Sequence, residues 1–123
     1  RAMAWLLRDG EVLASLEVAA TRAERRRGLL GRDGIDGALL IERTRSVHTA
    51  GMRFALDVAF CDAELEVVRT RRLVPWRVTF PVAAARCAIE AEAGAFARWG
   101  LRPGDRLEVR HAVDDPSDPG ATA

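Results

Sequence analysis

The chain has 123 residues, and its 19 basic and 18 acidic side chains nearly cancel to a net charge of +1. This length fits a single domain. Hydrophobic residues make up 49% of the chain, which is enough for a core, so we do not expect the chain as a whole to be disordered. The balanced charge gives no general attraction to nucleic acid or acidic membranes. No apolar run approaches the ~20 residues of a membrane-spanning helix.

Seven short segments have the apolar pattern of β-strands and are bounded by turn residues. In chain order they are residues 4–7, 11–19, 38–41, 56–62, 65–73, 86–93 and 106–110. The Asp9-Gly10 pair between the first two is typical of a tight hairpin turn. In the sixth segment, alternation places Cys87 and Ile89 on one face and Glu90 on the other.

Two short helices interrupt these strands. The first is predicted to begin at Thr21, because Thr21-x-x-Glu24 has the spacing of a capping box, in which each side chain accepts the other residue's backbone N–H. We expect this helix to end near Leu30, with Gly31 as its C-terminal cap. The second is predicted over residues 94–99.

Short strands with frequent turns, without regular alternation with long helices, predict a mainly β (α+β) fold. The expected architecture is a compact small β-barrel or closed sandwich of about seven strands with two short helices, since closure removes exposed strand edges. Residues 1–112 form one expected globular domain. Residues 113–123 form an acidic tail expected to be disordered, because it is rich in Pro, Gly and Asp.

Cys61 and Cys87 both fall in predicted strands. Structural thiols, a disulfide and reactive thiols are the alternatives that the sequence leaves open. No Cys-x-x-Cys motif or cluster of His and Cys indicates zinc, so we expect neither a metal nor a cofactor. The sequence shows no secretory signal, so we expect a cytoplasmic protein, or an exported one if a leader preceded Arg1.

A polar run at residues 46–57 lies between two apolar stretches and leads directly into a strand, as expected where a rigid scaffold presents functional groups. His48 titrates near neutrality and could act as a general base, a ligand or a loop hydrogen-bonding group. Asp57 begins an apolar strand, where a charge needs a partner. It could accept hydrogen bonds structurally, or orient His48 or a ligand.

Other candidates have a structural and a functional interpretation each. Arg22 and Arg53 could bind an anion. However, all 19 basic residues are arginine, which indicates either a GC-rich genome or selection for bidentate phosphate contacts. Trp76 and Phe80 could wall a pocket, stack a base or pack as a lid. Glu90 could be a buried structural acid or a second functional carboxylate beside Asp57.

Five segments together resemble the Domain of Unknown Function 192 family of small bacterial and archaeal proteins. The first matches "T-x-x-E-R-x-x-G-L-M-x-R", the third "T-x-I-P-L-D-V-x-F-x-D" and the fourth "V-L-E-L-x-A-G"; the segments are residues 20–32, 37–41, 52–62, 88–94 and 100–105. The resemblance implies a compact, mostly β fold and an open molecular function. Where many members have an aromatic-Met-Lys-Asn-Thr run, this chain has His48-Thr49-Ala50-Gly51-Met52, so a role resting on that lysine and asparagine is not expected.

These observations favour a non-enzymatic binding domain with a polar pocket at residues 46–57. The pocket would hold a small polar or anionic ligand, or a partner peptide. Its expected ligand-binding residues are Arg22, His48, Thr49, Met52, Arg53, Asp57 and Trp76.

Two alternatives come from other functional classes. A hydrolase or lyase would use His48 as base with Asp57 or Glu90, activating water directly because no credible serine, cysteine or metal nucleophile is present. An RNA-binding module would use arginines 25–27, 71, 72 and 77. The balanced charge argues against a nucleic-acid partner.

Overall fold

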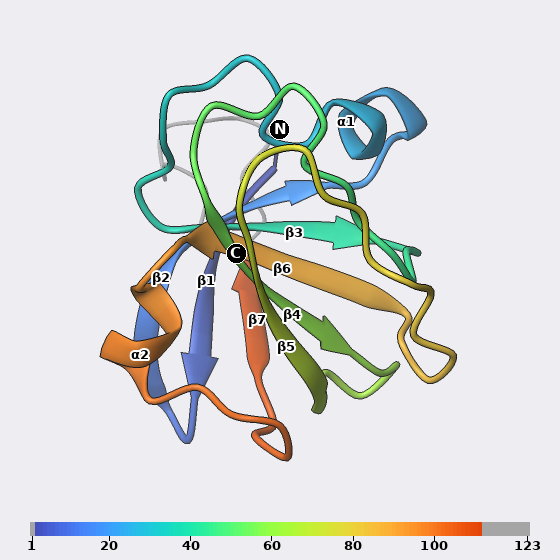
Figure 1. Ribbon diagram of the computed structural model, residues 1–123. Coiled ribbons are helices and arrows are strands. Elements are labelled where there is room, and N and C mark those ends of the chain that lie inside the picture. Colours follow the sequence, from blue (N-terminus) through green and yellow to red (C-terminus); the bar gives the residue numbers. More distant parts are fainter. Residues whose placement is uncertain (1, 112–123) are drawn as a thin grey trace.

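The computed structural model describes residues 2–111 (Figure 1). Their elements are β1 (Ala2–Arg8), β2 (Glu11–Ala19), α1 (Arg22–Arg27), β3 (Ala38–Glu42), β4 (Leu56–Cys61), β5 (Val67–Leu73), β6 (Cys87–Glu92), α2 (Ala95–Trp99) and β7 (Glu108–His111). The predicted mainly β class, seven strands and two short helices are therefore confirmed. The tail predicted at 113–123 lies outside the described residues.

All seven strands belong to one sheet of order β5-β4-β6-β3-β2-β1-β7, in which β2 and β3 are parallel and every other pair is antiparallel. The two edge strands do not form a ladder. They meet only near their starts, where Glu66 and Arg106 form an isolated bridge and the first residue of β5, Val67, donates its N–H to the Asp105 carbonyl at 2.8 Å. The sheet is thus curled but not closed into the predicted barrel.

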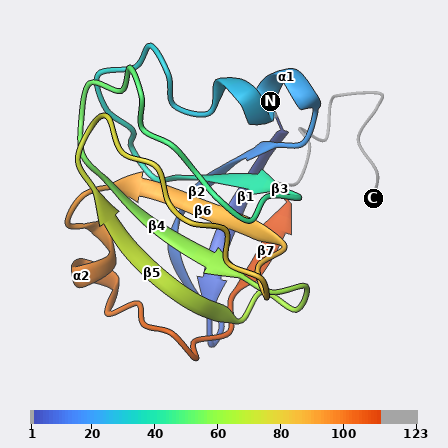
Figure 2. The same cartoon turned by 45° about the vertical axis from the view of Figure 1, so that its right-hand side comes forward.

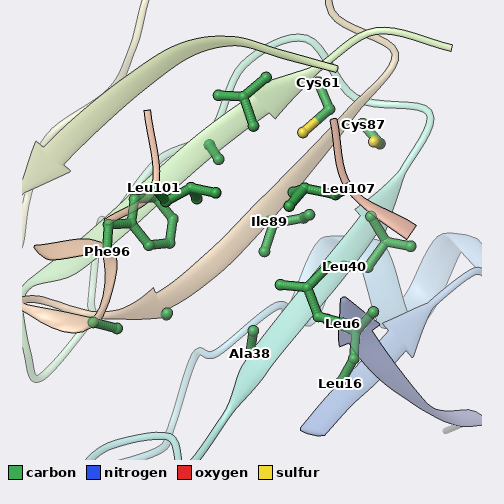
Figure 3. Packing of buried hydrophobic residues seen from close by; sticks show 14 of the residues in the cluster. Leu6, Leu16, Ala38, Leu40, Cys61, Cys87, Ile89, Phe96, Leu101 and Leu107 are labelled. Carbon is green, nitrogen blue, oxygen red and sulfur yellow. The ribbon is translucent and has the colours of Figure 1, made fainter. Parts of the chain in front are cut away.

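Buried apolar side chains form two clusters on opposite faces of this sheet, because successive strand residues alternate sides. Figure 3 shows the inner cluster, which includes Ile89, Phe96 and Leu107. The outer cluster includes Val58 and Phe60 from β4. We call the corresponding sides the inner face and the outer face.

Loops cover the outer face, whereas α2 contributes to the inner cluster. In Figures 1 and 2, α1 gathers with the loops over residues 28–37, 43–55 and 74–86 on one side of the sheet, and α2 lies apart from them. These loops add Leu29, Val47 and Met52 to the outer cluster. The outer face is therefore covered by segments that lie far apart in the sequence. Their irregular backbone can form a pocket on this face.

Helix α1 begins as predicted and ends earlier. The Glu24 N–H donates to Thr21 Oγ1 at 3.1 Å, and Glu24 Oε1 accepts the Thr21 N–H at 3.0 Å, so the capping box is confirmed. The helix ends at Gly28 rather than Gly31. Gly28 has φ 50° and ψ −127°, a conformation that only glycine adopts without strain, and its N–H donates to the Glu24 carbonyl at 3.0 Å.

Candidate functional site

A pocket of about 70 Å³ lies on the outer face, between the end of α1 and the loop over residues 44–52. Helix α1 contributes the consecutive arginines 25–27, the loop contributes His48 and Met52, and β6 contributes Glu90. We call this the α1 pocket. It combines cationic groups, one carboxylate and an apolar wall.

Local sequence explains how α1 delivers its arginines. The capping box fixes the first turn, so the last turn, which is entirely arginine, reaches the pocket. Arg25 is partly buried, and its Nη1 donates to the Ala20 carbonyl at 2.6 Å. Arg26 and Arg27 are exposed. One of the three arginines is therefore used to position the helix, while the other two bring positive charge to the pocket.

Glu90 supplies the carboxylate of the pocket and is only 3% exposed. It lies opposite Leu39 of β3 and Val58 of β4, two residues of the outer cluster. Gly28 packs close to it, since a Cβ at Gly28 would be 3.8 Å from Glu90 Oε1. The end of α1 and the buried acid are therefore packed against one another, and arginines 25–27 line the same pocket as Glu90.

His48 is exposed at the pocket and is anchored through its backbone, which forms an isolated bridge with Val78. The next residue, Thr49, is fully buried. Its Oγ1 donates to the Val74 carbonyl at 2.7 Å and accepts the Arg77 N–H at 2.8 Å. Thr49 therefore holds the loop over residues 74–77 in place, and its side chain is not among those lining the pocket.

Asp57 lies on the inner face, away from His48 and Glu90. Its Oδ2 accepts the N–H groups of Gly94 at 2.9 Å and Phe96 at 3.1 Å, and its Oδ1 accepts Arg72 Nε at 3.0 Å. The two backbone contacts cap α2, whose own N-cap residue, Gly94, has no side chain. The geometry supports the structural interpretation of Asp57.

The remaining predicted site residues lie outside the α1 pocket. Arg53 is exposed and pairs with Asp33 at 2.9 Å. Arg22 and Trp76 do not line the pocket either. Of the predicted ligand-binding set, the structure brings together only His48 and Met52, with Glu90 from the catalytic candidates.

Arginines 25–27 entered the sequence analysis only through the RNA-binding alternative, and their place in this pocket was not foreseen. The capping box could have indicated which turn they occupy. Arginines 71 and 72 lie on β5, and Arg72 is engaged by Asp57, so the six arginines of the RNA hypothesis do not form one surface around the pocket.

The two cysteines are free thiols that lie directly opposite one another on β4 and β6 (Figure 3). The pKa of the Cys61 thiol is raised, because it donates a hydrogen bond to the Cys87 sulfur and because burial disfavours the thiolate. They belong to the inner cluster and not to the α1 pocket.

Within residues 2–111, no group of three or more His, Cys, Asp or Glu side chains is arranged to hold a metal ion. No helix in that range is long and apolar enough to cross a membrane.

Several known proteins are similar to this chain. The DUF192 family model, described as Uncharacterized ACR, matches residues 4–109. A UPF0127 protein of Thermococcus sibiricus is 31% identical over 112 residues, covering 82% of this chain and 73% of the relative. A UPF0127 protein of Pyrococcus furiosus is 40% identical over 68 residues, covering 55% of this chain and 59% of the relative.

Two crystal structures share the fold. A Sinorhizobium meliloti protein, provisionally described as a transcription regulator, has a TM-score of 0.74 at 24% identity, covering 88% of this chain and 92% of that one. A protein of unknown function from Novosphingobium aromaticivorans has a TM-score of 0.72 at 23% identity, covering 87% and 83%. These identities support a common fold alone. The family match over residues 4–109 shows that the chain belongs to the DUF192 family.

Proposed function

We propose that this chain is a non-enzymatic binding domain, and that the α1 pocket holds a small polar ligand carrying an anionic group and a hydrogen-bond donor. The observation that carries the proposal is the convergence of the α1 arginines, His48 and the buried Glu90 on one pocket. Arg26 and Arg27 are exposed and suit the anionic group, while the buried carboxylate suits a hydroxyl or ammonium group.

The size of the pocket restricts the ligand. Its volume of about 70 Å³ is well below the roughly 300–1,000 Å³ of pockets for drug-sized ligands. A short hydroxy acid or amino acid fits this volume, whereas a nucleotide does not. The apolar wall, formed in part by Met52 and Ile41, suits one methyl or methylene group between the two polar ends.

A matched set of four probes tests this arrangement by amide chemical shifts in NMR titrations. Lactate and alanine carry both groups, acetate carries only the anion, and ethanolamine has no anion. We expect the first two to shift the amides of Gly28, His48 and Glu90, and to bind about tenfold more tightly than the other two, since each lost charge-assisted hydrogen bond costs about 1.5 kcal/mol.

Two variants separate this pocket from general surface binding. Glu90→Gln removes the charge of the carboxylate, and Arg27→Ala removes one exposed cation. Both should weaken lactate or alanine binding, whereas the matched control Arg110→Ala, on β7, should leave it unchanged. Equal binding by all four probes, or shifts that avoid these residues, would refute the proposal.

A hydrolase or lyase is the second candidate, because His48 and Glu90 line the same pocket and a base with a carboxylate can activate water. Asp57 is not part of this version, since it is engaged on the inner face. Slow conversion of a bound probe, followed by NMR and abolished by His48→Ala, would favour the enzyme over the binding domain.

A further inference from the structure

The loop over residues 74–80 exposes a large apolar side chain at every second position. Val74, Trp76, Val78 and Phe80 are exposed by 48%, 70%, 74% and 91%. Single exposed apolar residues are common on protein surfaces, but a contiguous set marks an interaction site. None of these four side chains lines the α1 pocket, and the inference below does not rest on the function proposed above.

The backbone of Trp76 is held in a conformation that keeps its ring outside. Its φ is 66°, a left-handed conformation that is rare and strained for a bulky residue. The Thr49 carbonyl accepts the Trp76 N–H at 2.9 Å, and the Thr49 side chain fixes Val74 and Arg77 on either side. A buried residue thus stabilises a strained turn that presents tryptophan to solvent.

A groove of about 160 Å³ lies between this loop and β5 on the outer face. Phe60 and Leu73 are its buried apolar lining, and the other side is formed by Val78 and Phe80 of the loop together with Val82, which follows it. In Figure 2 the loop runs across the sheet beside β4 and β5. Within the described part of the chain, β5 is an edge strand that pairs with β4 alone, so residues 2–111 leave its other backbone edge open along most of its length.

The charge around the groove has one sign. Arg69 and Arg71 line it, and Arg77 extends from the loop; all three are exposed. None of the three forms a salt bridge with a carboxylate among residues 2–111. Arginines on an edge strand also discourage aggregation, but that role does not account for the exposed Trp76 and Phe80 beside them.

We propose that this surface binds an extended segment of a partner protein in which acidic side chains alternate with apolar ones. The segment would lie along β5, insert apolar side chains between Phe80 and Leu73, and place carboxylates on Arg69 and Arg71. Nucleic acid is the competing ligand, because Trp76 and Phe80 could stack bases. The peptide is favoured because the other two exposed side chains, Val74 and Val78, are aliphatic, and because the open edge of β5 offers backbone hydrogen bonds to an extended chain.

Selection from a phage-displayed library of random 12-residue peptides tests this inference on the full chain. Enriched peptides should combine acidic with apolar residues. Their affinities are then measured by fluorescence anisotropy for Phe80→Ser, for the double variant Arg69→Glu/Arg71→Glu, and for Trp5→Ala. Phe80 is almost fully exposed, so its replacement does not threaten folding, and Trp5 is a second exposed tryptophan located on β1.

We expect Phe80→Ser and the charge-reversal variant each to weaken binding about tenfold or more, as for central interface residues. Trp5→Ala should change the affinity less than about twofold. The inference is overturned if no peptide is enriched, if the enriched peptides lack acidic residues, or if Phe80→Ser binds them normally. It is also overturned if a 12-nucleotide single-stranded RNA displaces the peptides and binds more tightly.

Discussion

Two buried acids on neighbouring strands show how differently the two faces of the sheet are used. Asp57 on β4 and Glu90 on β6 are 4% and 3% exposed, and they are one step apart in the register of the two strands. Asp57 points to the inner face, where backbone amides and an arginine saturate it. Glu90 points to the outer face, where it borders a pocket.

The difference follows from what covers each face. Helix α2 follows β6 closely in the sequence, and the backbone N–H groups at its start donate hydrogen bonds to Asp57. The carboxylate on the inner face is therefore engaged in holding the fold together. The outer face is covered by loops from separate parts of the chain, which leave a cavity beside Glu90. Burial alone therefore does not distinguish a structural carboxylate from a candidate for ligand binding, whereas the elements packed around each acid differ.

The largest effect is expected for Asp57→Ala. The change leaves two amides of α2 without their acceptor and removes the partner of Arg72, so it should lower the free energy of unfolding by about 3 kcal/mol. Urea unfolding measures the loss, and hydrogen exchange should show it first in α2. Asp57→Asn retains one acceptor oxygen and should lose less. A loss below about 1 kcal/mol for the alanine variant would contradict the structural role.

Local patterns were readable from the sequence, while long-range partners were not. The Thr21–Glu24 capping box was predictable because the two residues are three apart in the sequence. The alternation along β6 correctly placed the Glu90 and Ile89 side chains on opposite faces of the strand. The partners of Asp57 lie 37 and 39 positions further along the chain, so its structural and functional roles remained open alternatives.

Two errors have similar causes. Gly28 and Gly31 both have positive φ, and only the folded chain, in which Gly28 packs beside Glu90, shows which of them ends α1. Barrel closure was expected because it removes exposed strand edges, but β5 and β7 meet only near their starts, through residues 65–67 and 104–107. The α1 pocket depends on similar long-range packing, so the sequence indicated His48 and Glu90 separately and not their meeting.

A smaller effect is expected on the outer face from Thr49→Val, which keeps the side-chain shape and removes the hydroxyl. The Val74 carbonyl and the Arg77 N–H then lose their partner, at a cost of about 2 kcal/mol in urea unfolding. Hydrogen exchange should increase mainly in residues 74–77. If exchange increases equally in α2, the two faces are not as independent as the structure indicates.

Glu90→Gln should have less effect on stability, within about 1 kcal/mol of the natural chain in either direction. The amide keeps the shape and one acceptor oxygen, and losing a buried charge reduces the desolvation cost. Thermal or urea unfolding gives the value. A loss above about 2 kcal/mol would make Glu90 a structural acid like Asp57 and would remove the main contrast between the two faces.

The smallest change in the free energy of unfolding is expected from replacing Asp105. Comparing it with Asp57 shows how much burial adds to the stabilisation that an acid provides. It has the same kinds of donors as Asp57, because its Oδ2 accepts the Arg102 N–H at 3.0 Å and Arg8 Nη1 at 2.9 Å, but its side chain is 29% exposed. The Arg102 N–H, followed by the Arg8 guanidinium, lowers the pKa of this carboxyl. The stabilisation that the ionised Asp105 provides is therefore fully present above the ordinary aspartate pKa of about 3.9. It is lost as the pH falls through the lowered pKa of this carboxyl in the folded chain.

The measurement is the unfolding free energy of the natural chain minus that of Asp105→Asn, followed from pH 6 to pH 2. Solvent screening keeps the difference below about 1 kcal/mol at pH 6, and it should shrink toward zero at the acid end. A difference that grows as the pH falls would mean that the folded chain raises this pKa. A difference as large as that of Asp57→Ala would show that the shared set of donors, rather than burial, determines how strongly an acid stabilises this fold.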